Sequence, residues 1–396
     1  MCSAFTLIPM VKSFGFLPVY SFLGNMLILP FVTPVLSGSV LFGIVSALGL
    51  DIIAFAISNT VSALLLFIVS IAKIISHLPF STIKLYPLFT MYIFSSIIIL
   101  SGGIYLLHKN KTKSAICLCL IFALATGSVL LYNNKNEAKV IFADVGQGDC
   151  TIITLPQNEA VMVDFGTDFL DDYKLSEIKQ TLVKLNIRKL SAIFVSHFHT
   201  DHISGVIELA NEGLVNTLIL PKYYDIRDKE SCENYKELLS ASLKKPVKIK
   251  YVSDGSSVKI GKDAVFDVVL PSKDMFLEAN DMSTVVKLSY GRVSFLFTGD
   301  ISEDGTRYLL DKDINCDVLK VPHHGGKNRY IKNILENSSP EYAVISCGEN
   351  NMYNHPHHEI VSALEDHKTK IYRTDKMGAV SFEIDKTKIK SVSKMR

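Results

Sequence analysis

The polarity of this chain of 396 residues changes abruptly near Leu131. Before that residue the only carboxylate is Asp51, whereas from Glu137 onward carboxylates and lysines alternate with apolar residues, as they do on a soluble surface. The hydrophobic share of 48% therefore describes neither part, because the apolar excess is confined to the first. The change predicts two domains, a transmembrane helical region over residues 1–133 and a soluble domain over residues 134–396.

The first region contains four or five apolar segments, and the last two are each close to the roughly 20 residues that a helix needs to cross a bilayer. The segments are residues 17–36, 39–58, 59–76, 88–107 and 114–132. Prolines and an asparagine interrupt the first segment, which leaves open a broken or re-entrant helix and an ordinary kinked span. Asp51 is either an interfacial residue or a functional charge inside the membrane. This pattern predicts a multi-pass protein of the plasma membrane.

The distribution of lysines gives an orientation for these spans. Residues 108–113, HKNKTK, join the last two segments and carry three lysines. Lysine-rich loops tend to face the cytoplasm, and one span follows this loop, so the soluble domain is expected outside the cytoplasm. The bias is small, because other lysines lie on the opposite side: Lys73, Lys84, Lys135 and Lys139.

Short β-type runs that end in turns fill the soluble domain, with helical patterns between them. The runs include residues 138–146, 150–156, 160–166, 191–197, 217–222, 246–252, 264–271, 284–291, 293–300, 317–325, 342–348 and 379–384. Helical patterns cover residues 174–186, 203–212, 233–243, 329–337 and 358–367. This mixture of hairpins and crossovers predicts an α/β architecture with two sheets. Within it, LSYGRVSF predicts two strands joined by a tight turn at Gly291.

The densest group of chemically active side chains is HFHTDH, residues 197–202, directly after an apolar β run. Histidines at i and i+2 can leave a turn on the same side, so His197 and His199 can reach one cation. Asp201 and His202 can turn toward a second position nearby. Imidazole nitrogen together with carboxylate oxygen suits Zn²⁺, and also Mn²⁺ or Fe²⁺. The motif therefore predicts a metal site at the end of a strand, where a rigid sheet presents ligands on loops.

The HxHxDH motif after a strand resembles the metallo-β-lactamase-fold hydrolases, and three later motifs follow in the family's order. VDFG (163–166) resembles the first acidic motif, FTGD (297–300) the segment with the bridging aspartate, and VPHHGG (321–326) the late histidine motif. The resemblance implies an αββα sandwich that holds two divalent ions, Zn²⁺ or Mn²⁺. It also implies Asp300 as the bridging ligand and His324 as a further ligand, with His323 facing the substrate or donating a proton. The roles of these two histidines could be exchanged.

The chain departs from this family pattern at one ligand. The family has a further histidine between HxHxDH and the bridging aspartate, whereas no histidine lies between His202 and His323 here. NDMS (280–283) occupies about the right place, so Asp281 or Asn280 could supply an oxygen ligand. A harder ligand set of this kind favours Mn²⁺.

A narrower resemblance is to ComEC, the family of bacterial DNA-uptake channels. It rests on DVGQGDCTIITLP (144–156), the segment from NDMS to FTGD (280–300), LKVPHHGG (319–326) and NMYNHPHHEIVSAL (351–364), and it covers residues 139 to about 383. PVYSFLGNMLILPFVTPVL and ISHLPFS resemble the end of the family's membrane domain. The family usually has more spans before this point, so a truncated, split or reduced channel is expected. Single-stranded DNA, membrane lipid and other subunits of the competence machinery are the implied partners, while the oligomeric state stays open.

The resemblance implies a nuclease that cleaves phosphodiester bonds of incoming DNA, with His323, His355 and Asp201 as catalytic residues. Two alternatives stay open: a hydrolase of a small-molecule or cell-envelope ester or phosphodiester, and a transport component with a vestigial metal site. His357 and His358 are weaker candidates than His355 for the site. A basic groove with aromatic residues would suit DNA. The candidates for it are Lys222, Tyr223, Tyr224, Lys244, Lys245, Lys248, Lys250, Tyr251, Lys320, Lys327, Arg329 and Tyr330, although any one of these lysines is more simply a solvated surface residue.

Overall fold

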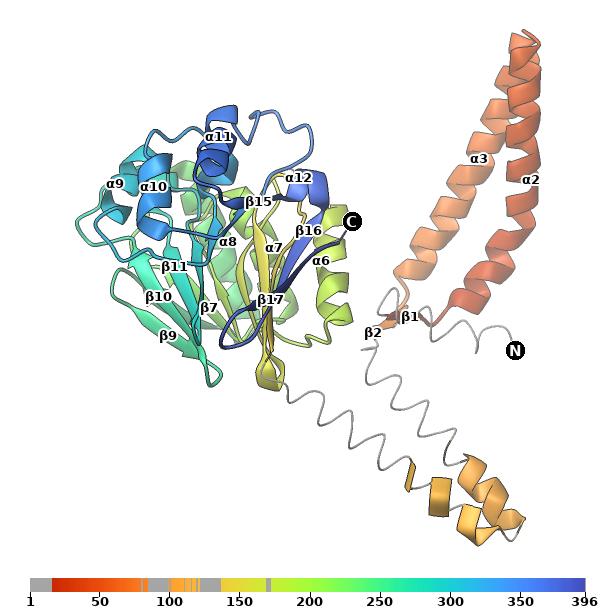
Figure 1. Cartoon of the computed structure of the whole chain (residues 1–396). Coiled ribbons are helices and arrows are strands. Elements are labelled where there is room, and N and C mark those ends of the chain that lie inside the picture. The colour runs from red at the N-terminus through yellow and green to blue at the C-terminus, as the bar shows by residue number, and fades with distance from the viewer. Residues whose placement is uncertain are drawn as a thin grey trace. The chain divides into compact units, whose positions relative to one another are not determined.

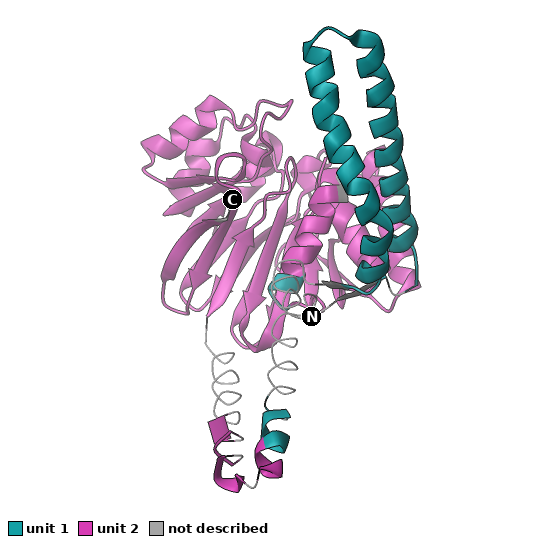
Figure 2. Cartoon of the chain, turned by 90° about the vertical axis from the view of Figure 1, so that its right-hand side faces the viewer, with its two compact units in different colours: residues 1–105, 183–186 teal, residues 106–182, 187–396 magenta. Residues whose placement is uncertain are grey.

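The computed structural model of the chain separates into two compact units (Figure 2). One comprises residues 1–105 with 183–186, and the other residues 106–182 with 187–396. The residues whose structure is described are 16–79, 81–84, 99, 101–109, 111–114, 116–118, 120–121, 137–168 and 172–395. The domain boundary at residues 133–134 stays a prediction.

Two long helices, α2 (Ser21–Ala47) and α3 (Asp51–Ser76), dominate the first unit (Figure 1). Both are long and apolar enough to cross a membrane. Their large apolar side chains are exposed on several faces, and Phe22 and Ile52 are more than 80% exposed. Water disfavours such a surface, whereas lipid does not. Two short strands, β1 (Phe16–Pro18) and β2 (Thr82–Lys84), pair antiparallel at the base of the helices.

The division of this region differs from the expected spans. The three segments expected over residues 17–76 form β1 and two helices, because the chain turns only once after Ser21, at residues 48–50. The helix α2 continues through Pro30 and Pro34, so it is not broken there. Asp51 is the first residue of α3, where its carboxylate complements the positive end of the helix dipole. The two further expected segments, 88–107 and 114–132, lie largely outside the described residues.

The first large sheet of the second unit has eight strands in the order β17-β16-β3-β4-β5-β6-β7-β8. Neighbours from β17 to β5 are antiparallel, and those from β5 to β8 are parallel. The strands are β3 (Ala138–Phe142), β4 (Cys150–Leu155), β5 (Glu159–Phe165), β6 (Ala192–Phe194), β7 (Thr217–Pro221), β8 (Lys248–Val252), β16 (Ala379–Ile384) and β17 (Ile389–Met395). The parallel half supplies crossover loops at one rim of the sheet, and the histidine motif follows β6 there.

The second large sheet has seven strands in the order β15-β14-β13-β12-β11-β10-β9. It repeats the same plan, because β9 to β12 are antiparallel and β12 to β15 are parallel. The strands are β9 (Ser257–Ile260), β10 (Ala264–Leu270), β11 (Val285–Tyr290), β12 (Val293–Phe297), β13 (Val318–Lys320), β14 (Tyr342–Ile345) and β15 (Lys370–Arg373). The predicted turn at Gly291 joins β11 to β12, and its φ of 65° suits glycine.

Helices lie outside the two sheets, which face each other across an apolar core (Figure 1). In that core Phe142 of the first sheet meets Phe297 of the second, with ring centroids 6.0 Å apart, and Phe382 meets Phe295 at 5.7 Å. The helices are α6 (Asp172–Lys184), α7 (Thr200–Glu212), α8 (Lys229–Lys244), α9 (Glu303–Leu309), α10 (Ile331–Ser338), α11 (His358–Asp366) and α12 (Thr374–Met377). This is the metallo-β-lactamase fold, so the predicted αββα sandwich is confirmed.

Candidate metal centre

A polar cavity of about 230 Å³ opens where loops from both large sheets meet. Its wall includes His199, Asp201, Asp300, His323 and His324. These residues come from the segments that follow β6, β12 and β13. The cavity therefore lies at the rim on which the sequence motifs were expected to converge.

The histidine motif spans the change from loop to helix. His197 and His199 lie in extended chain after β6, and Asp201 and His202 lie in the first turn of α7. The rings of His197 and His199 are 4.7 Å apart, and those of His197 and His202 are 4.2 Å apart. Ligand atoms of His197, His199 and Asp201 gather within 4.8 Å of one another. Four side chains of six consecutive residues thus point into one small volume.

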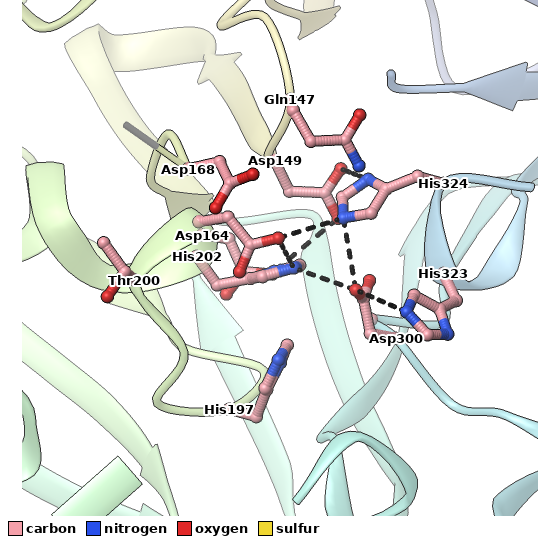
Figure 3. A network of polar contacts seen from close by, with 12 residues as sticks. Gln147, Asp149, Asp164, Asp168, His197, Thr200, His202, Asp300, His323 and His324 are labelled. Carbon is pink, nitrogen blue, oxygen red and sulfur yellow. Dashed lines mark hydrogen bonds and ion pairs between the residues drawn. The ribbon is translucent and has the colours of Figure 1, made fainter. Parts of the chain in front are cut away.

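The second sheet closes this group from the other side. Asp300 Oδ2 lies 3.3 Å from His202 Nε2 and 3.1 Å from His324 Nε2 (Figure 3). Together with Asp201 these residues form a second group whose ligand atoms lie within 4.8 Å of one another. Gly299 makes the approach possible, since its φ is 55° and a Cβ there would lie 2.7 Å from Ser283 Cβ. Asp201 belongs to both groups, so they adjoin.

Each of the four clustered histidines has one ring nitrogen held by a partner outside the cluster. His202 Nδ1 donates to Asp164 Oδ2 at 3.1 Å, and His324 Nδ1 donates to the Ser346 carbonyl at 2.9 Å. For the other two, Ser196 Oγ lies 3.0 Å from His197 Nδ1, and Asp228 Oδ2 lies 3.2 Å from His199 Nε2. Such partners fix which nitrogen faces the centre, as they do for histidines that bind metals.

The inward nitrogens provide a test of whether these residues fit a metal. Nε2 of His197 is buried and has no hydrogen-bond partner among the described residues. Nε2 of His202 and of His324 is also buried and faces Asp300 Oδ2, at 3.3 and 3.1 Å. A buried polar atom without a partner costs about 1–3 kcal/mol, and a cation at the cluster would remove that cost at His197. Imidazole nitrogens and carboxylate oxygens are ligands for divalent metals. The donor set therefore fits divalent metal binding.

The ionisation of the metal-free cluster reflects its charges. Burial would lower the pKa of both His202 and His324, but Asp300 and neighbouring carboxylates raise both pKa values. The pKa of His324 rises to about 10. The same ion pairs outweigh burial for Asp201 and Asp300 and hold the pKa of each well below its usual value. His197 is different, because burial and then His202 and His199 lower its pKa. Without metal, protons on two histidines neutralise the carboxylates.

A buried lysine adds a charge that the sequence did not indicate. Lys320 lies at the end of β13, is only 3% exposed, and forms an ion pair with Asp149. Its Nζ also lies 3.4 Å from Asp300 Oδ1 and donates to the Gly299 carbonyl at 3.0 Å. The expectation that Lys320 contributes to a DNA-facing surface is therefore wrong. It stabilises the loop that carries Gly299 and Asp300 instead.

The structure separates the two candidates for the missing ligand. Asp281 Oδ1 accepts hydrogen bonds from the backbone amides of Ser302 and Gly305. Among the described residues, Asp281 is not a member of either group of ligand atoms at the cavity. Asn280 lines the cavity, and its buried Oδ1 has no hydrogen-bond partner among those residues. The amide oxygen of Asn280 is thus the better placed of the two.

His323 and His355 line the cavity beside the cluster, with ring centroids 5.6 Å apart. Burial lowers the pKa of both, and neighbouring histidines lower that of His355 further, to about 4. The backbone of His323 and His324 lies at φ of 49° and 54°, a region that non-glycine residues rarely adopt. Such conformations gather at functional sites. His357 and His358 do not line the cavity.

Several residues of this site were missed from the sequence. They are Gln147, Asp149, Asp164, Asp168, Thr200, Asp228, Glu230 and Tyr353, which line the cavity or bind its histidines. Part of the signal was present in DVGQGDC and VDFG, where carboxylates interrupt buried strands. Gly148 brings the first of these loops against α7, because a Cβ there would lie 2.7 Å from the Asp201 carbonyl. The position of Asp228 in an exposed-looking loop gave no such signal.

Comparisons with known proteins agree with this geometry. A family profile described as the metallo-beta-lactamase superfamily matches residues 143–349. The chain is 28% identical over 291 residues to ComE operon protein 3 of Bacillus subtilis (strain 168). The aligned region covers 70% of this chain and 36% of that protein. It is 27% identical over 263 residues to competence protein ComA of Neisseria gonorrhoeae, which covers 65% of this chain and 34% of that protein. The resemblance to the ComEC family is thereby confirmed.

The chain spans about a third of the length of these curated relatives. Among solved structures, CmlA, a diiron beta-hydroxylase from Streptomyces venezuelae, is similar with a TM-score of 0.41 and 12% identity. The match covers 62% of this chain and 54% of that one.

Proposed function

Because the chain belongs to the metallo-beta-lactamase superfamily, we propose that its cavity is the active site of a metal-dependent phosphodiesterase that cleaves single-stranded DNA. The observation that carries this proposal is the arrangement of the four histidines. Each has one nitrogen held by a partner outside the cluster. The inward Nε2 of His197 is buried without a partner among the described residues, and the inward Nε2 of His202 and of His324 faces Asp300. A vestigial site would have no reason to keep these histidines and carboxylates buried together.

The ligand atoms divide between two positions, which supports two ions. His197, His199 and the Asn280 amide oxygen would hold one ion, and His202, His324 and Asp300 the other, with Asp201 in both groups of ligand atoms. An amide oxygen in place of a third histidine favours Mn²⁺ at the first position, although Zn²⁺ suits the histidines. Bound there, divalent ions would activate water for attack and neutralise negative charge on the phosphate oxygens.

The other residues of the cavity would bind and orient the phosphate. The lowered pKa of His355, about 4, keeps its ring neutral at neutral pH, and a neutral imidazole still has one N–H to donate. His323, whose pKa is also lowered and whose ring centroid lies 5.6 Å from that of His355, would do the same. Two such donors stabilise the charge that develops on phosphate oxygens. Lys320 would keep Asp149 and Asp300 in position through its ion pairs with both carboxylates.

The relatives supply the biological context. Because the curated matches are competence proteins, the proposed substrate is DNA during uptake, at a membrane and beside a channel. The helices α2 and α3 support membrane association. Several spans, a soluble domain outside the cytoplasm, contacts with other competence subunits and a domain boundary at residues 133–134 are part of this proposal. A second candidate is a hydrolase of small phosphodiesters, which the modest cavity of about 230 Å³ would also admit.

Purified full-length protein in detergent, supplied with Mn²⁺ or Zn²⁺ and a labelled single-stranded oligonucleotide, tests the proposal. Cleavage that disappears in His199→Ala and Asp201→Ala would support it. His358→Ala is the matched control, because this histidine is exposed and lies outside the cavity. Hydrolysis of bis(p-nitrophenyl) phosphate without cleavage of DNA would favour the small-molecule hydrolase. No turnover of either substrate by protein that has bound metal would refute both.

A further inference from the structure

A second cavity, of about 440 Å³, lies in the same unit and has a different character from the metal site. Its wall is mainly apolar and aromatic, and includes Tyr223, Tyr224, Ile226 and Phe276. Ile226 is 75% exposed and Phe276 is 85% exposed. Large apolar side chains that are exposed to solvent around a concave surface commonly mark a binding site.

Two segments of chain connect this cavity to the metal site. Residues 222–227 line the apolar cavity, and the next residue, Asp228, contacts His199. On the other wall, Met282 lines the apolar cavity and Asn280 lines the metal site. Neighbouring residues of the same two segments therefore reach both cavities, so the cavities adjoin along these segments.

The aromatic wall is fixed to the histidine motif itself. The ring of Tyr224 packs edge-to-face against Phe198 at 5.1 Å, and Phe198 also contacts Tyr235 at 5.0 Å. Phe198 is fully buried between the two metal-binding candidates His197 and His199. A ligand that rests on this wall would therefore be held in a defined position relative to the metal site.

Positive charge surrounds the apolar wall. Three cations, Lys222, Lys273 and Arg227, line the cavity together with one carboxylate, Asp225. Arg227 pairs with that carboxylate at 2.7 Å, which leaves the two lysines to attract an anion. Aromatic faces beside lysines suit single-stranded nucleic acid, since bases stack on the rings while phosphates meet the cations.

We propose that this cavity binds an unpaired nucleobase of the DNA strand whose neighbouring phosphate occupies the metal site. The inference rests on the proposed nuclease function and names a subsite for it. Phe276, which is 85% exposed, would supply the face on which the base stacks. Lys273 would contact a flanking phosphate, as would Lys222, whose Nζ lies over the Tyr223 ring, 5.5 Å from its centroid. A base that is paired in a duplex could not enter, so the subsite would favour single strands.

The absence of tryptophan from the sequence provides a direct reporter. Phe276→Trp in the full-length protein, kept metal-free with a chelator, places a single indole at the subsite. A thymidine oligonucleotide should quench its emission by stacking, whereas an abasic oligomer of the same length should not. Leu243→Trp on α8, at a residue 88% exposed and outside the cavity, is the control and should stay unquenched. Equal quenching at both positions, or none at Phe276→Trp, would overturn the subsite.

Binding and cleavage by truncation variants give the second arm. Phe276→Ala should raise the Kd for the thymidine oligonucleotide about tenfold and leave the Kd for the abasic oligomer unchanged, while Leu243→Ala alters neither. Hydrolysis of bis(p-nitrophenyl) phosphate should keep its wild-type rate in Leu243→Ala. If the wild type cleaves no DNA but the reporter still responds to bases, the nuclease proposal fails and the subsite stands. If DNA is cleaved with the same KM in Phe276→Ala, only the subsite fails.

A membrane surface would also attract exposed apolar residues beside lysines, and the reporter can distinguish it. In nanodiscs with brominated lipids, a surface that inserts into the bilayer would show quenching of Phe276→Trp without any oligonucleotide. That result, together with no response to the thymidine oligonucleotide, would overturn the inference.

Discussion

Asp228 is expected to tune the metal site through His199, although it lies outside the cluster. Its Oδ2 accepts a hydrogen bond from the Ser231 amide at 2.7 Å, which caps α8, and lies 3.2 Å from His199 Nε2. Removing a carboxylate that orients a metal-binding histidine typically lowers metal affinity tenfold to a hundredfold. That change corresponds to about 1.4–2.7 kcal/mol. Removing the helix cap costs about 1 kcal/mol of folding stability.

Two substitutions separate these effects. Asp228→Ala should lose both, with metal affinity down tenfold or more and the free energy of unfolding of the chelated protein lower by about 1 kcal/mol. Asp228→Ser should lose only metal affinity, because serine is a good helix cap but its hydroxyl is too short to reach His199.

Competition with a fluorescent chelator measures the affinity, and urea unfolding in excess chelator measures the stability. If Asp228→Ser binds Mn²⁺ as tightly as the wild type, Asp228 does not orient His199 for metal binding. If both variants lose affinity only in proportion to their lost stability, Asp228 acts on the fold and not on His199.

The charges and the backbone give four further predictions. The pKa of His324 is raised to about 10, so the stability its ion pairs give the chelated protein should be present below about pH 6.5 and lost as the pH rises toward 10. Metal binding near pH 7 should accordingly release about two protons, from His202 and His324, and calorimetry in buffers of different ionisation enthalpy would detect fewer than one if this is wrong. Lys320→Met should destabilise the chelated protein by about 3–5 kcal/mol and the metal-loaded protein by less, because bound cations replace the lost charge; equal losses in urea unfolding would contradict this. Gly299→Ala should abolish cleavage and lower stability by more than Gly255→Ala, where φ is also positive, at 79°, but the space around a Cβ is open. Similar effects of the two would argue against crowding at Ser283.

The sheets of the soluble unit could be predicted because their strands are apolar runs bounded by turn residues. The loops after β6, β12 and β13 could be predicted for the same reason, since histidines and aspartates follow directly on those runs. Strands β9, β15 and β17 were missed, and their alternating polar residues carry a weaker signal. In the membrane unit, hydropathy marked the apolar stretches but not the single turn near Gly49, so two helices were divided into three.

The contributions that sequence could not give depend on residues far apart in the chain. Lys320 looked like a surface cation because its partner Asp149 is 171 positions away, and only the fold shows that both are buried. The choice between Asn280 and Asp281 depends on a short 3₁₀ turn, in which adjacent side chains point in different directions. Pattern reasoning could name the pair of residues but not which of them faces the cavity.

The metal content of the full-length protein is the most direct test of the central claim. Protein stripped with a chelator, loaded with Mn²⁺ or Zn²⁺ and passed through a desalting column would be measured by mass spectrometry of the metal. The wild type should retain up to two ions per chain, Asp300→Ala and His202→Ala should clearly retain less metal, and His358→Ala should retain as much as the wild type. A folded wild-type protein that retains neither ion would contradict the claim that this cavity binds divalent metal.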